Sequence, residues 1–286
     1  MAAMFIAALC FSSCDHNNGE DNNGEDNNGG GSNGGGSNSG GGSNHEYPAT
    51  ADVIPKAVKD IDGNWYDAVR IGNQIWMAEN LRTTRYANGI EIPLGDDGSK
   101  TLPQRYYPNN NITNVTKYGY LYNWPAVMHV AYSSNANPSG AQGICPDGWH
   151  VPSKAEWDKL TNYLEGQPTY WTNRNSDYIA KALASNHDWT QDLPDSISSQ
   201  LAISPVYDPI NSPGHNLSTN NATGFSAAPA GSSKGTGGFG YSAYFWSSTE
   251  EYDFGPFVIG LATCYPIVLS GKLPKDYGFS VRCVKD

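Results

Sequence analysis

A run of 30 residues near the start of the chain, 15–44, contains no aliphatic, Phe, Tyr or Trp side chain and no Lys or Arg. It consists almost wholly of Asn, Gly, Ser, Asp and Glu. Such a segment cannot bury enough apolar surface to offset the conformational entropy lost on ordering. We therefore expect residues 15–46 to form a disordered tether, and the folded part of the chain to be confined to residues 47–286.

The residues before this tether are apolar and end in a cysteine. Residues 11–14, Phe-Ser-Ser-Cys, resemble a lipobox, in which small residues let a signal peptidase cut before a lipid-modified cysteine. We therefore expect residues 1–14 to be a lipoprotein signal segment and Cys14 to carry the lipid. A Gly-rich tether of this length holds a domain about 30 Å from a membrane on average. An ordinary cleaved signal peptide, or an apolar segment of no significance, is the alternative.

Acidic side chains follow Cys14 closely and resemble the signal by which Bacteroidetes lipoproteins reach the outer face of the outer membrane. They are Asp15, Glu20, Asp21, Glu25 and Asp26. The expected location is therefore the outer membrane, with the domain facing the cell exterior.

The folded part is mildly acidic and rich in aromatic residues. Of the net charge of −11, −5 belongs to residues 47–286, because six acids and no Lys or Arg precede them. Phosphate binding needs clustered Lys and Arg, so we expect no nucleic-acid partner. All 8 Trp and 18 Tyr lie in this part, together with many Gly, Asn and Pro residues. This mixture is typical of a loop-rich domain outside the cytoplasm.

Local patterns predict strands at both ends of the folded part. After a linker over residues 47–59, turn residues at 62–64 and 72–73 indicate two hairpins within residues 60–78. Near the other end, short apolar runs bounded by turn residues predict further strands. These runs are residues 243–249, 256–262, 266–270 and 278–284.

The clearest helix lies between these groups of strands. Ser153 and Glu156 form a capping-box pattern, and an apolar face of helical period follows until Gly166. A second helical stretch is expected over residues 176–185, and a short helix over 124–130. The order of strands, helices, long loops and strands predicts an α+β fold.

Five motifs occur in an order that resembles one known family. They are Trp76-Met-Ala-Glu-Asn-Leu81, Tyr118-Gly-Tyr-Leu-Tyr-Asn-Trp124, Ile144-Cys-Pro-Asp-Gly-Trp-His-Val-Pro-Ser-Lys-Ala-Glu-Trp157, Phe245-Trp-Ser-Ser-Thr-Glu250 and Gly278-Phe-Ser-Val-Arg-Cys-Val-Lys-Asp286. Over residues 60–286 the chain is similar to the Fibrobacter succinogenes major paralogous domain. The resemblance implies a C-type-lectin-like fold at the cell surface, with two helices, small antiparallel sheets, long loops and the last strand paired with the first. It brings no catalytic residues.

The same motifs imply a disulfide. If Cys10 is removed with the signal and Cys14 is lipidated, three cysteines remain. Cys145 and Cys283 both lie in family motifs, so we expect them to pair in an oxidising compartment. Free buried thiols are the alternative, and the role of Cys264 stays open.

The sequence shows no catalytic constellation. Its six His residues are scattered, it has no Gly-x-Ser-x-Gly turn, and its glycine runs precede the folded part. Formylglycine-generating enzymes share the implied fold and need two nearby reactive cysteines for copper; here Cys264 could at most supply one, with Cys283 as the other, and such an enzyme is the remote alternative. We therefore expect no enzyme and no cofactor, although Asp96-Asp97 leave calcium binding open.

Aromatic residues in loops point to binding. The candidates, which lie in or beside loops rich in Asn and Asp, are Tyr132, Tyr170, Trp171 and Trp189. Such a mixture stacks on sugar rings and hydrogen-bonds their hydroxyls. For each ring taken singly, packing in the core is the alternative and the one that we favour. We therefore expect a non-catalytic binding module for a glycan or a surface protein, with its site at these rings or in the loops between residues 193 and 240. A structural or assembly subunit of a surface structure, such as a filament, is the alternative.

Overall fold

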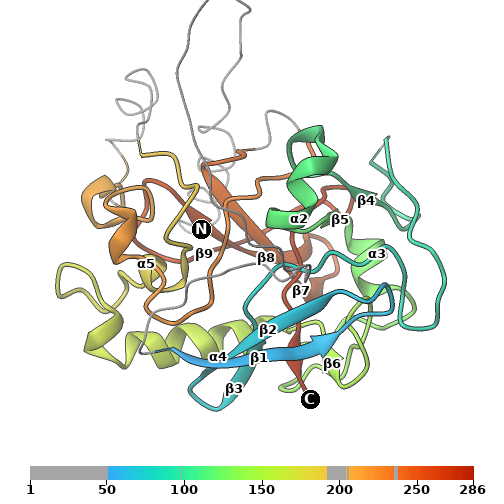
Figure 1. The fold of residues 1–286 in the computed structure, drawn as a ribbon, viewed down its shortest axis with the longest axis horizontal. Coiled ribbons are helices and arrows are strands. Elements are labelled where there is room, and N and C mark those ends of the chain that lie inside the picture. The colour runs from blue at the N-terminus through green and yellow to red at the C-terminus, as the bar shows by residue number, and fades with distance from the viewer. Residues whose placement is uncertain (1–50, 97, 192–203, 205, 235–237) are drawn as a thin grey trace, which may run out of the picture.

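The structure is a computed structural model that describes residues 51–96, 98–191, 204, 206–234 and 238–286. The expected signal segment, Cys14 and the tether therefore lie outside the described residues. The described chain has short helices and small antiparallel sheets joined by long loops, which is the α+β class expected from the sequence (Figure 1). Among its helices, none has the length and apolar character required to cross a bilayer.

The largest sheet has five strands in the order β1-β2-β3-β10-β6. Their bounds are β1 Asp52–Lys59, β2 Trp65–Ile71, β3 Gln74–Met77, β10 Val284–Lys285 and β6 Trp149–His150. Both expected hairpins are present, with turns at 60–64 and 72–73. The expected linker over 47–59 is wrong in its second half, because β1 pairs with β2 from Asp52 onward, across a bulge between Ile54 and Val58.

The last strand differs from the expectation in both length and partner. β10 pairs with β3 and β6, and β2 is the neighbour of β1. Before β10 the chain passes several partners in turn: Phe279 bridges to Tyr122 and Ser280 to Phe245. A segment that changes partner at almost every residue cannot form one regular ladder, which is why Val284 alone, of the seven residues 278–284 expected to form a strand, belongs to β10.

The remaining strands form two smaller sheets. A three-stranded sheet in the order β7-β8-β9 is built from β7 Ser242–Glu251, β8 Gly255–Ala262 and β9 Leu269–Lys272. A two-stranded sheet consists of β4 Arg105–Tyr106 and β5 Leu121–Tyr122. The expected strands at 243–249 and 256–262 are thus confirmed, whereas the one at 266–270 begins later.

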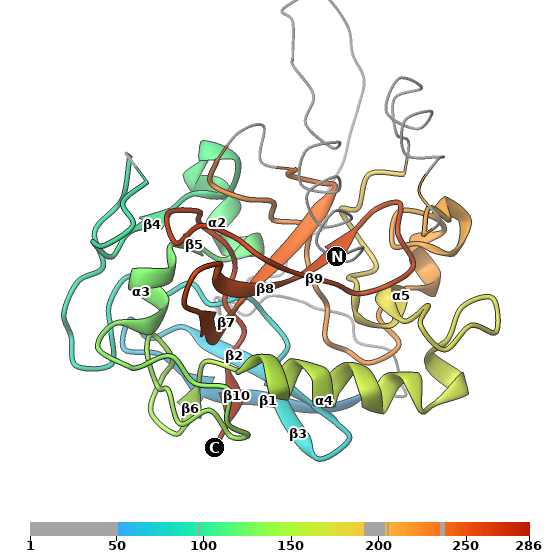
Figure 2. The same cartoon turned by 180° about the vertical axis from the view of Figure 1, so that it is seen from behind.

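The longest helix, α4 Lys154–Glu165, matches its sequence signals. The Ser153 hydroxyl accepts from the Glu156 amide, the Glu156 carboxylate accepts from the Ser153 amide, and Gly166 is the C-cap. Helix α4 lies across the five-stranded sheet (Figure 2). Its apolar face packs on that sheet, and the ring centroids of Trp157 and Trp76 are 4.5 Å apart.

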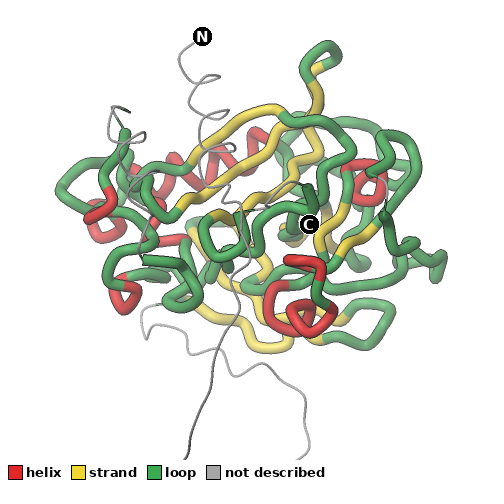
Figure 3. The backbone as a smooth tube through the Cα atoms, turned by 90° about the horizontal axis from the view of Figure 1, so that it is seen from above, coloured by secondary structure: helices red, strands yellow, loops and turns green. Residues whose placement is uncertain are grey.

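The other helices are short. They are α2 Val115–Tyr118, α3 Trp124–Met128 and α5 Ala180–Leu183, with 3₁₀ turns η1 Pro108–Asn110, η2 Ile112–Asn114, η3 Pro168–Tyr170, η4 Pro209–Asn211 and η5 Leu217–Thr219. The helix expected over 176–185 is therefore too long. Asn175 accepts from the Asp177 amide through its side chain, and Ala184 leaves the helix to bridge to Ala227. Loops make up much of the fold (Figure 3).

Strand β7 has core on both of its faces. Trp246 belongs to one apolar cluster, which also contains Cys145, Trp149 and Cys283. Phe245 belongs to a second apolar cluster, which also contains the apolar face of α4. Both side chains are fully buried. A strand with two buried faces alternates between two cores rather than between core and solvent.

Arg282 is 1% exposed, and its guanidinium lies over the ring of Phe245 in the second apolar cluster. Its guanidinium donates to the side-chain oxygen of Asn80 at 2.7 Å, to the Met77 carbonyl at 3.0 Å, to the Ser226 carbonyl at 2.8 Å and also to the Phe225 carbonyl. These acceptors belong to two parts of the chain, residues 77–80 and 225–226, that are distant in sequence from each other and from Arg282. The buried side chain therefore joins the end of β3, the 225–226 loop and the segment just before β10.

Candidate functional site

Three hollows in the described surface border one loop, residues 137–143. The largest, about 340 Å³, is lined by residues 86–88, 129–131, 140, 142 and 143. We call it the Tyr86 hollow. Two others, of about 230 and 220 Å³, lie on the side of the loop where His150, Glu156 and Asp286 meet.

Local structure places the walls of the Tyr86 hollow. Tyr86 begins a tight turn, in which its amide donates to the Ile90 carbonyl at 2.9 Å. His129 is the C-cap of α3, and its amide donates to the Pro125 carbonyl at 3.0 Å. Gly143 has φ 54°, and a Cβ there would lie 2.2 Å from the Val127 carbonyl oxygen. Only glycine therefore lets the 140–143 wall approach α3 this closely.

The rings of Tyr86 and His129 stack at the hollow, with centroids 3.8 Å apart and planes 20° from parallel. Tyr86 is 2% exposed, and its hydroxyl has no hydrogen-bond partner among the described residues. Burial raises the pKa of the Tyr86 hydroxyl and lowers the pKa of the His129 imidazole. Both groups are therefore favoured in their uncharged forms at neutral pH.

The lining of the Tyr86 hollow is polar but carries no Asp, Glu, Lys or Arg side chain. Its amide groups come from Asn88 and Gln142, which are both exposed. Val130 lies on the lining and is 81% exposed, and Tyr132, two residues later, is 92% exposed. The hollow thus combines a stacked aromatic pair with neutral hydrogen-bonding groups, and an exposed tyrosine follows its lining in the chain.

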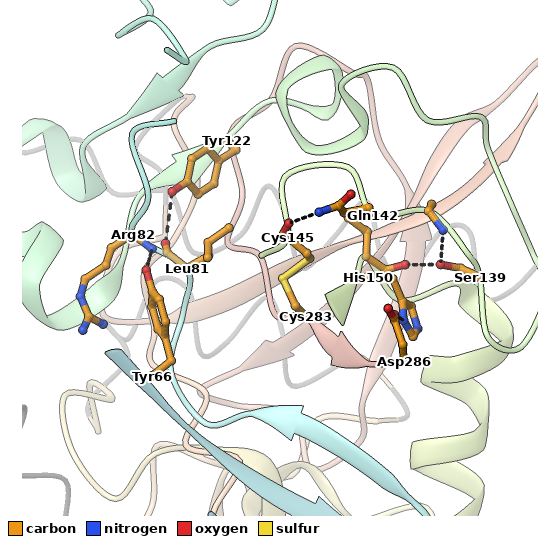
Figure 4. Close-up of a disulfide and its surroundings, with 12 residues drawn as sticks. Tyr66, Leu81, Arg82, Tyr122, Ser139, Gln142, Cys145, His150, Cys283 and Asp286 are labelled. Atoms are coloured by element: carbon orange, nitrogen blue, oxygen red, sulfur yellow. Dashed lines mark hydrogen bonds and ion pairs between the residues drawn. A yellow bond between two sulfur atoms is a disulfide. The ribbon is translucent and has the colours of Figure 1, made fainter. Parts of the chain in front are cut away.

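A buried histidine supports the other side of the 137–143 loop (Figure 4). His150 Nδ1 lies 2.7 Å from Asp286 Oδ1, and its Nε2 lies 2.8 Å from Glu156 Oε1. Burial acts to lower the pKa of His150, but the hydrogen bonds and charges of the two carboxylates outweigh it and raise the pKa. Glu156 also accepts from the Ser139 amide at 3.1 Å, which fixes the loop to the start of α4.

A disulfide joins Cys145 to Cys283, the pair implied by the family motifs, with Cα atoms 6.0 Å apart. Figure 4 shows it between the loop that bears Gln142 and the last segment of the chain. Cys264 is a buried thiol in a separate small cluster. The alternative of a Cys264–Cys283 copper pair is therefore wrong, because Cys283 is already bonded to Cys145.

The four aromatic candidates from the sequence lie in different environments. Tyr132 is exposed and directly follows Ala131, which lines the Tyr86 hollow. Tyr170 and Trp171 are half-buried, and the Trp171 indole donates to the Leu164 carbonyl at 3.1 Å near the end of α4. Trp189 is 2% exposed in the core, so its expected role in ligand stacking is wrong. Its loop sequence does not reveal that the loop folds inward.

The long loop between 193 and 240 also differs from the expectation. Residues 192–203, 205 and 235–237 lie outside the described residues. Of the rest, residues 220–231 are almost all buried, and Phe225 packs against Trp76 and Trp157. Within residues 209–221, exposure is confined to short stretches near η4 and η5. The stretch 220–231 of this loop therefore belongs largely to the core.

Among the described residues, no group of three or more His, Cys, Asp or Glu side chains is arranged to hold a metal ion. Of the pair considered for calcium, Asp97 lies outside the described residues. The aspartates of the 60–64 turn are engaged by protein donors: the Tyr66 hydroxyl donates to Asp60 at 2.6 Å, and the Thr84 amide donates to Asp62 at 2.5 Å.

Sequence reasoning missed the two residues at the centre of the hollow. Tyr86 and His129 lie in separate loops, and neither belongs to a motif that we singled out. The only local signal at His129 is its position after a short helix that begins with Pro125. Such a signal predicts a helix end but gives no partner across the fold.

Comparison with protein families matches residues 69–285 to the model described as the Fibrobacter succinogenes major domain. Comparison with curated proteins gives no match, and comparison with solved structures gives none either.

Proposed function

This chain belongs to the Fibrobacter succinogenes major domain family, and we propose that it is a lipid-anchored, surface-exposed, non-catalytic binding module that recognises glycans. We also propose that its α+β fold is of the C-type-lectin-like type. Support for the fold is the long helix α4 with the short α5, the small sheets, and one sheet that holds strands from both ends of the domain.

The observation that carries the binding proposal is the preformed Tyr86 hollow. Ligand sites are concave, have aromatic and apolar walls, and contain a few polar groups that fix orientation. This hollow has those features, together with the neutral amides of Asn88 and Gln142. A glycan offers what such a lining can bind, namely C–H faces for stacking and hydroxyls for hydrogen bonds. Rigid strands and helices hold the loops that form it.

The anchor proposal depends on Cys14 and on the tether after it. Replacing Cys14 by Ala should leave the chain unacylated and free of the membrane, because no other cysteine combines small preceding residues with a polar tether. Palmitate labelling and membrane fractionation of the variant would measure this. A Cys10→Ala variant is the control and should keep its lipid. Continued palmitate labelling of the Cys14→Ala variant would show that the lipid is attached to another residue, and it would contradict the assignment to Cys14.

We expect Tyr132→Ala to weaken glycan binding about two- to tenfold, the range for one aromatic contact. The melting temperature should stay unchanged, because the side chain is 92% exposed. The full chain in detergent would be screened on a glycan array, and hits would be titrated calorimetrically. Tyr252→Ala is the matched control, since Tyr252 is 96% exposed on the turn between β7 and β8.

The same experiment separates the proposal from its alternative. Sharp hits that depend on Tyr132 and not on Tyr252 support glycan recognition. Silence on the array, together with stoichiometric co-purification of envelope proteins, would favour a structural or assembly subunit. Equal loss of binding in both variants would mean that the ligand contacts exposed tyrosines without selection, and the site assignment would fail.

A further inference from the structure

We propose that the His129 imidazole is a displaceable cover on Tyr86, and that an uncharged sugar ring takes its place on the Tyr86 face. The assignment of a sugar as the ligand rests on the proposed function, whereas the assignment of His129 as a cover rests on the geometry of the described residues alone. Four features of the described residues carry it: the stacked rings, the backbone at His129, the unsatisfied Tyr86 hydroxyl and the uncharged lining.

The backbone at His129 is unfavourable for a side chain. Its φ is 50° and its ψ is −112°, which lies outside the left-handed helical region that Asn and Asp tolerate. Glycine adopts such a conformation freely, so a glycine here would relieve strain. Histidine stands there instead, and its ring covers Tyr86. Strain that persists at a ligand-sized hollow is a sign of a functional side chain rather than of a preferred turn residue.

While the His129 ring covers Tyr86, the buried hydroxyl of Tyr86 lacks a hydrogen-bond partner among the described residues. Buried polar atoms are normally paired, and an unpaired one destabilises the state that contains it. If the imidazole moves away, a ligand hydroxyl can approach and pair with this group. The free energy recovered there offsets the loss of the ring stack.

The chemistry of the lining selects the ligand class. The residues around the hollow bring no Asp, Glu, Lys or Arg side chain, so a charged ligand would lose hydration without gaining an ion pair. The imidazole is flat and packs parallel to Tyr86 at 3.8 Å. The C–H face of a pyranose ring is also flat and apolar, while its hydroxyls lie at the edge. An uncharged sugar ring therefore fits the space that the imidazole leaves.

His129→Gly in the full chain tests the cover. We expect the melting temperature to be kept, because glycine suits this backbone. Tyr86 should become reactive toward tetranitromethane, as mapped by mass spectrometry, with the exposed Tyr132 as the internal standard. Affinity for maltotetraose or mannotetraose should rise about three- to tenfold, since no ring stack needs to be broken. Tetragalacturonate, the charged counterpart, should not bind.

Two further variants make the result specific. Arg174→Gly is the matched control, because Arg174 is exposed and also has a positive φ, 54°. It should change neither the Tyr86 reactivity nor the affinity. Tyr86→Phe, introduced into the His129→Gly chain, keeps the ring and removes only the hydroxyl. It should abolish the gain in sugar affinity.

The outcomes distinguish the cover from the proposed function. Tyr86 reactivity in His129→Gly without binding of any sugar supports the cover and overturns the glycan assignment. An unreactive Tyr86 in His129→Gly overturns the cover, even if the wild-type chain binds sugar. Preferential binding of tetragalacturonate overturns the assignment to an uncharged ligand. An unchanged affinity after Tyr86→Phe overturns the role of the hydroxyl.

Discussion

Arg282→Met is expected to lower the free energy of unfolding by about 3–5 kcal/mol. The substitution keeps an apolar stem but removes every donor from a site that is 1% exposed. It leaves the Met77, Phe225 and Ser226 carbonyls without the hydrogen bonds that the guanidinium makes. It also removes a cation that stacks 4.6 Å from the Phe225 ring centroid. Chemical denaturation of the full chain would measure the loss.

Arg282→Lys is the control for charge alone. Lysine keeps the positive charge but cannot reproduce the planar arrangement of donors, so most of the loss should remain. If either variant unfolds within about 1 kcal/mol of the wild type, the guanidinium does not hold these segments together. The 225–226 loop would then have to be stabilised by its aromatic contacts alone.

Removing the disulfide should have an effect of similar size. Cys145 and Cys283 are separated by 138 residues, and a crosslink over such a distance restricts the unfolded chain strongly. In the chain-entropy model, Cys145→Ala together with Cys283→Ala should lower the free energy of unfolding by about 4–5 kcal/mol. Urea denaturation with and without reductant would measure the difference.

The reductant provides the internal control for this experiment. Wild-type chain should lose stability when reduced, whereas the double variant should not respond. A Cys264→Ser chain should still respond, because Cys264 is a buried thiol outside the crosslink. A double variant as stable as the oxidised wild type would show that the bond adds nothing beyond the packing around it. Sensitivity to reductant that requires Cys264 would contradict the pairing.

The parts of the fold that the sequence predicted well are specified by neighbouring residues. Helix α4 depends on the Ser153–Glu156 capping box and on Gly166 at its end, which are all local. The hairpins depend on turn residues between short apolar runs. Where pairing depends on distant partners, as for residues 278–284, the sequence predicted a strand but neither its length nor its neighbours.

Burial of individual loop residues was the main failure of sequence reasoning. Trp189 looks like a loop aromatic available to a ligand, yet it is buried. The polar loop around Phe225 enters the core because Arg282 satisfies its carbonyl groups. A buried loop needs partners for its backbone, and those partners come from another part of the chain. Composition cannot reveal such a partner.

The sequence alone determined the family, the α+β class, the main helix and the cysteine pair implied by its motifs, because these depend on local patterns or on motifs in order. The tertiary structure alone decided which aromatic rings are exposed and placed Tyr86 against His129, 43 residues later. Local propensities act over a few residues, whereas a binding hollow needs side chains from several loops at one point. Only the packing of the whole chain sets that meeting point.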